Sequence, residues 1–395
     1  MKQKIALAAD WICICSCRKR SRRGKPLAFS ISGSKKTGGG LFLIIYLVLV
    51  LTVGFVLLTT DIAIGRKTGK SAIYAYESMR KKWKFLGVIT FLVPVLIMTY
   101  YAVIGGWILR YIVIYLTSSG KQAVADDCFT AFISSPSSVW YGLIFMLLTA
   151  LIVYNGVEEG IERVSKFIMP VLLIMVIGIA IFSLTLKTTL DDGTVRTGLQ
   201  GLKVYMKPDL TGITVGRFLQ ITLDAMSQLF FSLSVSMGIM ITYGSYVKKD
   251  VDLNKAVSQI EIMDTGVAFL AGVMIIPAVF VFSGLDGMSA GPGLMFVSLP
   301  KVFYSMGTVG RVIGILFFVL AGFAALTSCI SVLESITANC MELFHTERKK
   351  TTRVLSVIYL IATAVIALWI QHLLCRSCTS KRKYRTASGY HGLYQ

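Results

Sequence analysis

The stretch FFSLSVSMG, residues 230–238, lies in the middle of an apolar run that extends from about 215 to 246. Three serines and a glycine weaken a helix there, because Ser competes for backbone hydrogen bonds and Gly loses more conformational freedom on folding. Backbone at membrane depth must be hydrogen-bonded internally, so a break is tolerated only where it is buried in protein or lines a cavity. The freed carbonyl and N–H groups can then bind a cation and a carboxylate. The stretch predicts a site for a small molecule and an ion inside a membrane protein.

The composition of the whole chain agrees with a membrane protein. Of the 395 residues, 55% are hydrophobic and only 15% are charged, against about 25% charged in a soluble average. A transmembrane helix needs about 20 apolar residues. Eight apolar spans meet or approach that length, at 41–64, 86–116, 138–156, 164–186, 213–246, 259–284, 308–342 and 351–371.

The charge of the loops predicts how these spans are oriented. Lys and Arg gather in cytoplasmic loops of membrane proteins, and loops 65–85, 247–258 and 343–353 hold seven, three and four of them. We expect these loops in the cytoplasm and loop 118–137, with Lys121 alone, outside. Loop 187–212 is also expected outside, although its four basic residues do not favour that side.

A net charge of +20 raises the question of a nucleic-acid partner. Ten of the 40 basic residues lie in 1–40 and five in 371–395, and most of the others flank the apolar spans. That distribution is what the orientation rule produces. We therefore expect a multi-pass protein of the cell membrane that contacts the lipid bilayer and binds no nucleic acid.

Motifs along residues 37–345 occur in the order and at the spacing of a known family. They are Gly38-Gly39-Gly40, Tyr46, Ile62-Ala63-Ile64-Gly65-Arg66, Tyr100-Tyr101 with Gly106-Trp107, Asn155-Gly156, Met169-Pro170, the run 228–246, Gly291-Pro292-Gly293 and Ala324-Ala325-Leu326-Thr327-Ser328. With them the chain resembles the neurotransmitter:sodium symporter family, in its bacterial amino-acid branch. Each motif alone is weak, and their common order makes the resemblance specific.

The resemblance implies an all-α polytopic membrane protein with the leucine-transporter-like inverted-repeat fold. Two repeats of five helices would hold the substrate site at the membrane midplane, between a broken first and a broken sixth helix. The implied function is sodium-coupled amino-acid symport by alternating access, so the chain is not expected to be an enzyme. A non-transporting membrane protein on the same fold, acting as a regulator or receptor, remains the alternative.

The chain departs from the family at its first helix. Residues 11–36 read WICICSCRKRSRRGKPLAFSISGSKK, with eight basic residues from Arg18 to Lys36, and cannot span lipid. Codons can be chosen for Trp11 to Lys35 so that a shift of one base gives GFVFAAAGSAVGVGNLWRFPYLAAK, which looks like the missing helix. We expect a frameshift here, and the alternative is a genuine basic arm that binds anionic lipid.

The C-terminal segment suggests the same event. Shifted by one base, Trp369 to Gln395 can read GSSIFYVEVALANGNTGQLLDIMDYIS, which looks like the family's connection between its ninth and tenth helices. The predicted organisation is an aberrant segment at 1–40, a symporter core of helices two to nine at 41–371 and an aberrant tail at 372–395. The fold would then be incomplete, with about eight helices, and we expect that this chain does not transport whereas its intact parent would.

The resemblance implies two sodium sites. Ser232 and Asp264 would belong to the first, and Asp264 would also supply the negative charge that chloride supplies in animal members, so chloride is not expected to be required. The alternative for Asp264 is an ordinary acid near a helix end. Ala324, Thr327 and Ser328 would line the second site, although Thr and Ser in a membrane helix often bond back to their own helix.

The resemblance also implies a substrate site. Tyr101 would contact the substrate carboxylate, unless it is an interfacial anchor. The other substrate-binding residues would be Phe231, Ser232, Ser234, Met237, Ile97 and Val332. Met237 stands where many members have Phe and leaves a flexible wall suited to a larger apolar side chain, so we expect a hydrophobic or aromatic amino acid.

Acidic residues give little support to an enzyme. Asp61, Asp264 and Glu334 are the only acids expected to be buried, and we find no catalytic triad, phosphate-binding loop or metal motif in the sequence. Asp61 stands where the family usually has Glu, which braces the first helix, so the shorter acid puts that brace in doubt.

Overall fold

The computed structural model describes residues 39–118, 120–125, 127–155, 160–189, 193–208, 213–248, 250–284 and 294–390. Of residues 39, 160–169, 283, 294 and 374–390 the backbone alone is described. The segment 1–40, where a first helix was expected and a frameshift predicted, lies outside the described residues except at its last two positions. The frameshift prediction for this segment therefore stays a prediction, and the one for the C-terminal segment is not tested by the backbone of α16.

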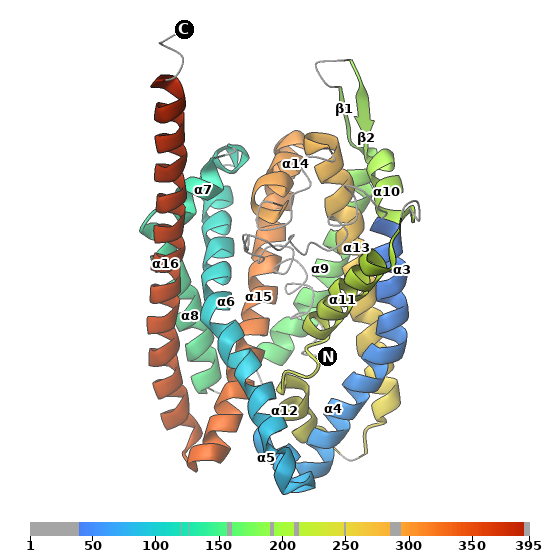
Figure 1. Ribbon diagram of the computed structural model, residues 1–395, viewed down its shortest axis with the longest axis vertical. Coiled ribbons are helices and arrows are strands. Elements are labelled where there is room, and N and C mark those ends of the chain that lie inside the picture. The colour runs from blue at the N-terminus through green and yellow to red at the C-terminus, as the bar shows by residue number, and fades with distance from the viewer. Residues whose placement is uncertain are drawn as a thin grey trace.

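Helices make up nearly all of the described chain (Figure 1). The first half contains α3 Gly39–Leu49, the π-helical turn η1 Val50–Gly54, α4 Phe55–Thr68, α5 Ala72–Met79, the 3-10 turn η2 Lys81–Trp83, α6 Lys84–Ser118, the 3-10 turn η3 Lys121–Val124, α7 Cys128–Ile133, α8 Ser137–Asn155 and α9 Gly160–Thr185. The second half contains β1 Lys187–Thr189, β2 Val195–Thr197, α10 Gly198–Met206, α11 Val215–Ser232, α12 Ile239–Ser245, α13 Leu253–Ser283, the π-helical turn η4 Leu294–Ser298, α14 Leu299–Ser305, α15 Gly307–Phe344 and α16 Arg348–Tyr390.

Six helical spans of the described chain are long and apolar enough to cross a membrane, at Gly40–Thr68, Lys81–Ser118, Ser137–Asn155, Leu253–Phe282, Gly307–Phe344 and Arg348–Leu373. They correspond to six of the eight predicted spans. The predicted span 164–186 is α9, whose described side chains form the shorter apolar helix Pro170–Thr185. The predicted span 213–246 is two helices, α11 and α12, because it is broken in the middle as the serine-rich stretch predicted.

The basic loops share one end of the bundle, as the sequence predicted. In Figure 1, α5 of loop 65–85, the α12–α13 connection and the α15–α16 connection lie at the bottom. The short helix α7 and the β1–β2 hairpin lie at the opposite end. The described part of loop 187–212 therefore lies away from the three loops expected in the cytoplasm, despite its four basic residues.

Several stretches expected as loops carry structure of their own. The hairpin pairs β1 with β2 in antiparallel register, Lys187 opposite Thr197. Thr197 then starts α10, because its hydroxyl accepts from the Gln200 N–H while the Gln200 side chain accepts from the Thr197 N–H. Such reciprocal bonds satisfy two N–H groups that a helix start leaves free. Helix α16 continues to Tyr390, well past the predicted span end at 371.

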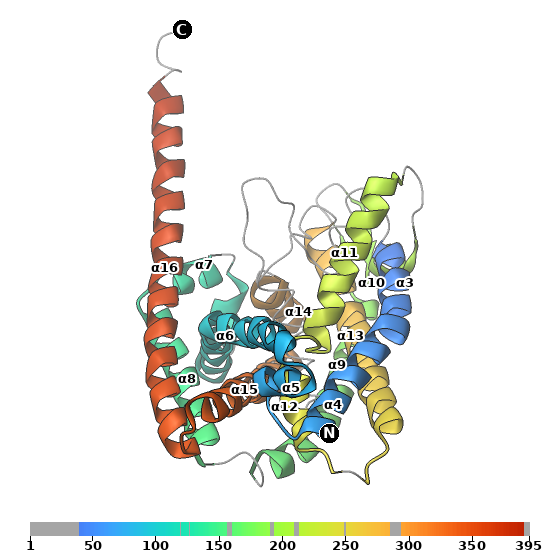
Figure 2. The same ribbon diagram turned by 60° about the horizontal axis from the view of Figure 1, so that its bottom comes forward.

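Close contact between α4 and α12 depends on two glycines. A Cβ added at Gly65 would lie 2.0 Å from the carbonyl oxygen of Ile241, and one added at Gly244 would lie 2.5 Å from that of Ile62. Neither is possible without a shift, so glycine is required on both helices. Small residues allow membrane helices to approach to backbone contact. This contact places α4 directly against α12, the second half of the broken span, whereas α11, the first half, lies beside α3 (Figure 2).

Candidate substrate and sodium site

The break between α11 and α12 is built from unusual backbone. Residues 233–238 form turns, and Ser234, Ser236 and Gly238 have φ values of 51°, 59° and 71°. Serine rarely adopts positive φ, because its Cβ crowds the backbone. The break thus leaves local strain and unpaired backbone groups that other residues must compensate.

An acid on α4 holds one of those backbone groups. Asp61 is 4% exposed, and its Oδ2 accepts a 2.7 Å hydrogen bond from the Ser236 N–H. A charged acceptor makes such a bond shorter and stronger than a neutral one. From the sequence, an Asp in place of the family's Glu put the brace to the first helix in doubt. In the structure Asp61 braces the break between α11 and α12, and the segment expected to hold the first helix lies outside the described residues.

Helix α15 supports the other end of the break. The Ser335 hydroxyl lies 3.4 Å from the Gly238 carbonyl oxygen, which also accepts a 3.0 Å bond from the Thr242 hydroxyl. The two hydroxyl oxygens are 3.2 Å apart. Gly238 is therefore tied both to its own helix α12 and to α15.

The two residues predicted for the first sodium site are in contact. The Ser232 hydroxyl, at the end of α11, donates a 2.7 Å bond to Asp264 Oδ2 on α13. Ser232 is fully buried and Asp264 is 3% exposed. One turn earlier on α11, the side-chain Nε2 of Gln228 is buried without a hydrogen-bond partner. Hydroxyl and carboxylate oxygens next to freed backbone form a ligand set of the kind that hard cations prefer.

The residues predicted for the second sodium site lie on α15. Ala324 is fully buried and Ser328 is 2% exposed. The Thr327 hydroxyl donates a 2.8 Å bond to the Ala324 carbonyl oxygen in its own helix. This bond within the helix uses the proton of the Thr327 hydroxyl and not its lone pairs, so it is compatible with a hydroxyl that binds a cation.

The predicted substrate residues come from three helices and the break. Tyr101 is 2% exposed and Ile97 is 8% exposed on α6, and Val332 is 7% exposed on α15. Met237 in the break is buried, and all four belong to one apolar core against which Phe231 packs. Ser234 is half-buried. The predicted apolar residues therefore lie in the interior of the bundle, and their assignment to one substrate site stays a prediction.

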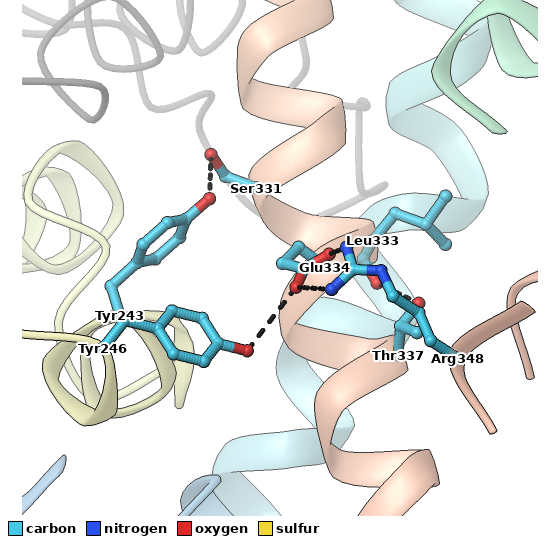
Figure 3. A network of polar contacts seen from close by, with 7 residues as sticks. All are labelled: Tyr243, Tyr246, Ser331, Leu333, Glu334, Thr337 and Arg348. Carbon is cyan, nitrogen blue, oxygen red and sulfur yellow. Dashed lines mark hydrogen bonds and ion pairs between the residues drawn. The ribbon is translucent and has the colours of Figure 1, made fainter. Parts of the chain in front are cut away.

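A polar network at the inner end of α15 was not assigned to the site from sequence (Figure 3). Arg348 of α16 forms an ion pair with Glu334, with Nη1–Oε1 at 3.0 Å and Nη2–Oε2 at 2.5 Å. The Tyr246 hydroxyl lies 3.5 Å from Glu334 Oε1, and the Tyr243 hydroxyl donates a 2.9 Å bond to Ser331. These contacts join the inner half of the broken span to α15 and α16. The only sequence signal was an acid inside an apolar span.

One expectation about buried acids was wrong. Asp61, Asp264 and Glu334 were expected to be the only buried acids, but Glu261 is buried as well, at 4% exposure. Glu261 lies near the start of the predicted span 259–284. Helix α13 begins earlier, at Leu253, so Glu261 lies inside the bundle.

The sequence pattern of the Sodium:neurotransmitter symporter family matches residues 32–139 and 129–374. The chain belongs to this family. Its relatives include an uncharacterized sodium-dependent transporter, YhdH, of Bacillus subtilis, 36% identical over 321 residues that cover 79% of this chain and 67% of the relative. Another, MJ1319 of Methanocaldococcus jannaschii, is 32% identical over 352 residues, covering 83% and 68%.

A solved structure shows the fold of the symporter family. The crystal structure of MhsT in complex with L-phenylalanine superimposes with a TM-score of 0.77 at 34% identity, covering 94% of this chain and 80% of that one. The predicted family and the helical fold class are therefore confirmed. Membership makes the chain a multi-pass protein of the cell membrane in a family of sodium-dependent transporters, and not an enzyme.

Proposed function

We propose that these helices form the core of a sodium-coupled amino-acid symporter that works by alternating access. The observation that carries the proposal is the buried contact between Ser232 and Asp264 at the break. A broken helix at membrane depth beside an intramembrane acid is the arrangement in which transporters bind their coupling ions. The name of the family supports sodium as that ion.

The first sodium ion would bind at Ser232 and Asp264. Sodium would take the place of the hydroxyl proton between the two oxygens, and the Ser232 hydroxyl would turn to offer a lone pair. The second would bind at the Ala324 carbonyl oxygen with the hydroxyls of Thr327 and Ser328. Both sites need further oxygen ligands, which in this family fold would come from the first helix.

The substrate would be an amino acid with an apolar or aromatic side chain. The Tyr101 hydroxyl would donate a hydrogen bond to the substrate carboxylate. The freed N–H groups of the break would donate further hydrogen bonds to it. The side chain of the substrate would lie among Ile97, Phe231, Ser234, Met237 and Val332. The L-phenylalanine bound to MhsT, at 34% identity, supports this class of substrate.

Chloride would not be required for transport. The carboxylate of Asp264 already places one negative charge beside the first sodium site. A second anion next to it would be repelled, because like charges at short range in a low-dielectric interior cost free energy. Sodium-driven uptake should therefore be unchanged when chloride is replaced by gluconate.

We further propose that the first helix is encoded in another frame, so the chain as written lacks half of each sodium site. The basic composition of residues 11–36 supports this proposal. Sequencing the DNA and the transcript across codons 7–40 and 365–395 tests it directly. A frame without any one-base gain or loss nearby would refute it.

Uptake of radiolabelled phenylalanine, leucine and alanine into vesicles tests the function. We expect sodium-dependent uptake of the larger side chains by a version with the reading frame restored, its loss in Asp264→Asn, and no uptake by the chain as written. Sodium-dependent binding without uptake by the restored version would favour a receptor instead. Absence of any sodium-dependent binding would refute the symporter.

A further inference from the structure

The connection between α5 and α6 presents a surface that is both basic and apolar. It lies at the end of the bundle that is expected in the cytoplasm (Figure 1). All residues from 78 to 86 are exposed, and we call them the basic segment. Its charged members are Arg80, Lys81, Lys82 and Lys84, and its large apolar members are Met79, Trp83, Phe85 and Leu86. The segment contains no acid, so its charge is strongly positive.

The backbone keeps these side chains on the surface. Helix α5 ends at Met79, Arg80 is extended with φ −158° and ψ 126°, and η2 follows as a single 3-10 turn. Runs of 3-10 helix are short, and no residue of this turn is buried. Helix α6 then packs against α5 at Gly87, where an added Cβ would lie 2.6 Å from the Ile73 Cα. Burial of the chain therefore resumes only after the basic segment.

Lys84 differs from the other three basic residues of the segment. Its ammonium group lies 3.0 Å from the carboxylate of Glu77 in α5, so its charge is partly balanced within the protein. Arg80, Lys81 and Lys82 are exposed and have no acidic partner among the described residues. Three charges are therefore left for a partner outside the protein. They suit an anion that accepts several hydrogen bonds, such as a phosphate group, because Lys and Arg side chains are donors only.

The exposed apolar side chains of α6 begin where the basic residues end. They are Phe85, Leu86, Val88, Ile89, Leu92 and Leu96. These residues belong to the span Lys81–Ser118, which is long and apolar enough to cross a membrane. The same order occurs on α16, where the exposed residues Lys349, Lys350 and Arg353 precede the exposed residues Val354, Val357 and Ile358. Basic residues followed by exposed apolar ones are typical of the boundary between headgroups and hydrocarbon.

One contact shows that the two boundaries lie at a similar depth. The Tyr359 hydroxyl of α16 donates a 3.4 Å hydrogen bond to the Val95 carbonyl oxygen of α6. Val95 lies eleven positions after Lys84, the first residue of α6, and Tyr359 lies eleven positions after Arg348, the first residue of α16. Each separation is about 16 Å along a helix axis. Both helices therefore begin at one level, where the phosphate groups of a bilayer leaflet would lie.

We propose that the basic segment binds the headgroup of an anionic phospholipid in the cytoplasmic leaflet. Arg80, Lys81 and Lys82 donate hydrogen bonds to the phosphate oxygens, and the acyl chains lie along the exposed apolar side chains of α6. Trp83 lies between headgroup and hydrocarbon, a depth at which tryptophan is enriched. Clusters of basic residues next to a membrane helix attract anionic lipid. A lipid fits this surface better than a nucleic acid or an acidic peptide, because neither of those offers hydrocarbon to the apolar side chains.

Fluorescence quenching of Trp83 tests the proposal on the purified full chain in lipid nanodiscs. Either phosphatidylglycerol, which is anionic, or phosphatidylcholine, which is zwitterionic, carries a nitroxide quencher near its headgroup. The difference between the unaltered chain and Trp83→Phe gives the signal of Trp83. We expect a preference of about fivefold or more for the anionic lipid, the factor that one basic residue near the surface contributes. No amino acid or sodium gradient is present, so the result does not depend on the proposed transport function.

A triple variant and a matched control make the result specific. Arg80→Gln, Lys81→Gln and Lys82→Gln, made together, should remove most of the preference. The control carries Lys187→Gln, Lys203→Gln and Lys207→Gln, which remove three exposed charges at the opposite end of the bundle. It should keep the preference, because it lowers the net charge equally and leaves the basic segment intact.

Two measurements on the unaltered chain need no variant that folds. High salt should weaken the preference, because exposed charges are screened. Inorganic phosphate added at constant ionic strength should leave it unchanged, and its loss would indicate a site for a soluble anion and overturn the proposal. Equal quenching by the two lipids in the unaltered chain would also overturn it, as would a full preference in the triple variant.

Discussion

The broken span α11–α12 and the continuous helix α15 both carry proposed sodium ligands, but they hold them in different ways. In α15 the hydroxyls of Thr327, Ser331 and Thr337 bond to carbonyl oxygens three or four residues earlier. In the break, the Ser236 N–H depends on Asp61, 175 residues away in the sequence. A continuous helix satisfies its own polar groups, whereas a break must be satisfied by other helices. Substitutions that remove a contact from another helix should therefore destabilise the break more than they destabilise α15.

The largest loss of unfolding free energy is expected when the ion pair between Glu334 and Arg348 is broken. This pair lies at the inner ends of both regions. Arg348→Ala leaves the Glu334 side chain, which is 5% exposed, without its counter-charge. Removing one partner of a buried ion pair costs about 3 kcal/mol or more of unfolding free energy. Thermal unfolding of the purified protein in detergent measures the loss.

Its control is the opposite truncation, Glu334→Ala. The Arg348 side chain is 34% exposed and can turn its charge to water. This variant should therefore lose clearly less stability than Arg348→Ala. Equal losses of stability in the two variants would show that Glu334 finds another partner or water when Arg348 is absent. The prediction that Arg348→Ala is the more destabilising variant would then be wrong.

The next largest loss of stability is expected at the close contact between α4 and α12. Gly65→Ala would put a Cβ 2.0 Å from the Ile241 carbonyl oxygen. Overpacking of this kind costs about 2–3 kcal/mol when backbone must move. Gly266→Ala in α13 is the matched control, because a Cβ there meets nothing within 4 Å. Unfolding temperatures should fall in the first variant and stay equal or rise in the second.

A smaller effect is expected at the brace of the break. Asp61→Ala leaves the Ser236 N–H without its acceptor, which costs about 1–2 kcal/mol for a partly buried donor. Asp61→Asn keeps an acceptor oxygen and should recover most of that loss. Hydrogen exchange at the Ser236 amide gives a local measurement, and unchanged protection in Asp61→Ala would contradict the bracing role.

The smallest effects compare the two proposed sodium sites directly. Ser232→Ala removes the bond to Asp264 and should cost about 1 kcal/mol. Thr327→Ala removes a hydroxyl bonded only within its own helix and should change stability by about 0.5 kcal/mol or less. Chemical unfolding of both variants measures the difference. A larger loss in Thr327→Ala would reverse the contrast between the regions.

Patterns along the chain predicted much of the fold. The serines at 232, 234 and 236 predicted the break, because a weakened helix is a local property of those residues. Length and hydropathy found the spans, and the order of motifs found the family. The elements inside loops, such as α5 and α10, were not predicted, because short helices give a weak periodic signal.

The sequence by itself determined the spans, the place of the break, the family and the residue types at the proposed sites. Each follows from side-chain chemistry or from backbone preference over a short stretch. The tertiary structure decided which groups meet: Asp61 with Ser236, Ser232 with Asp264, and Gly65 with Ile241. Those outcomes depend on how helices far apart in the sequence pack side by side, and no local pattern carries that information.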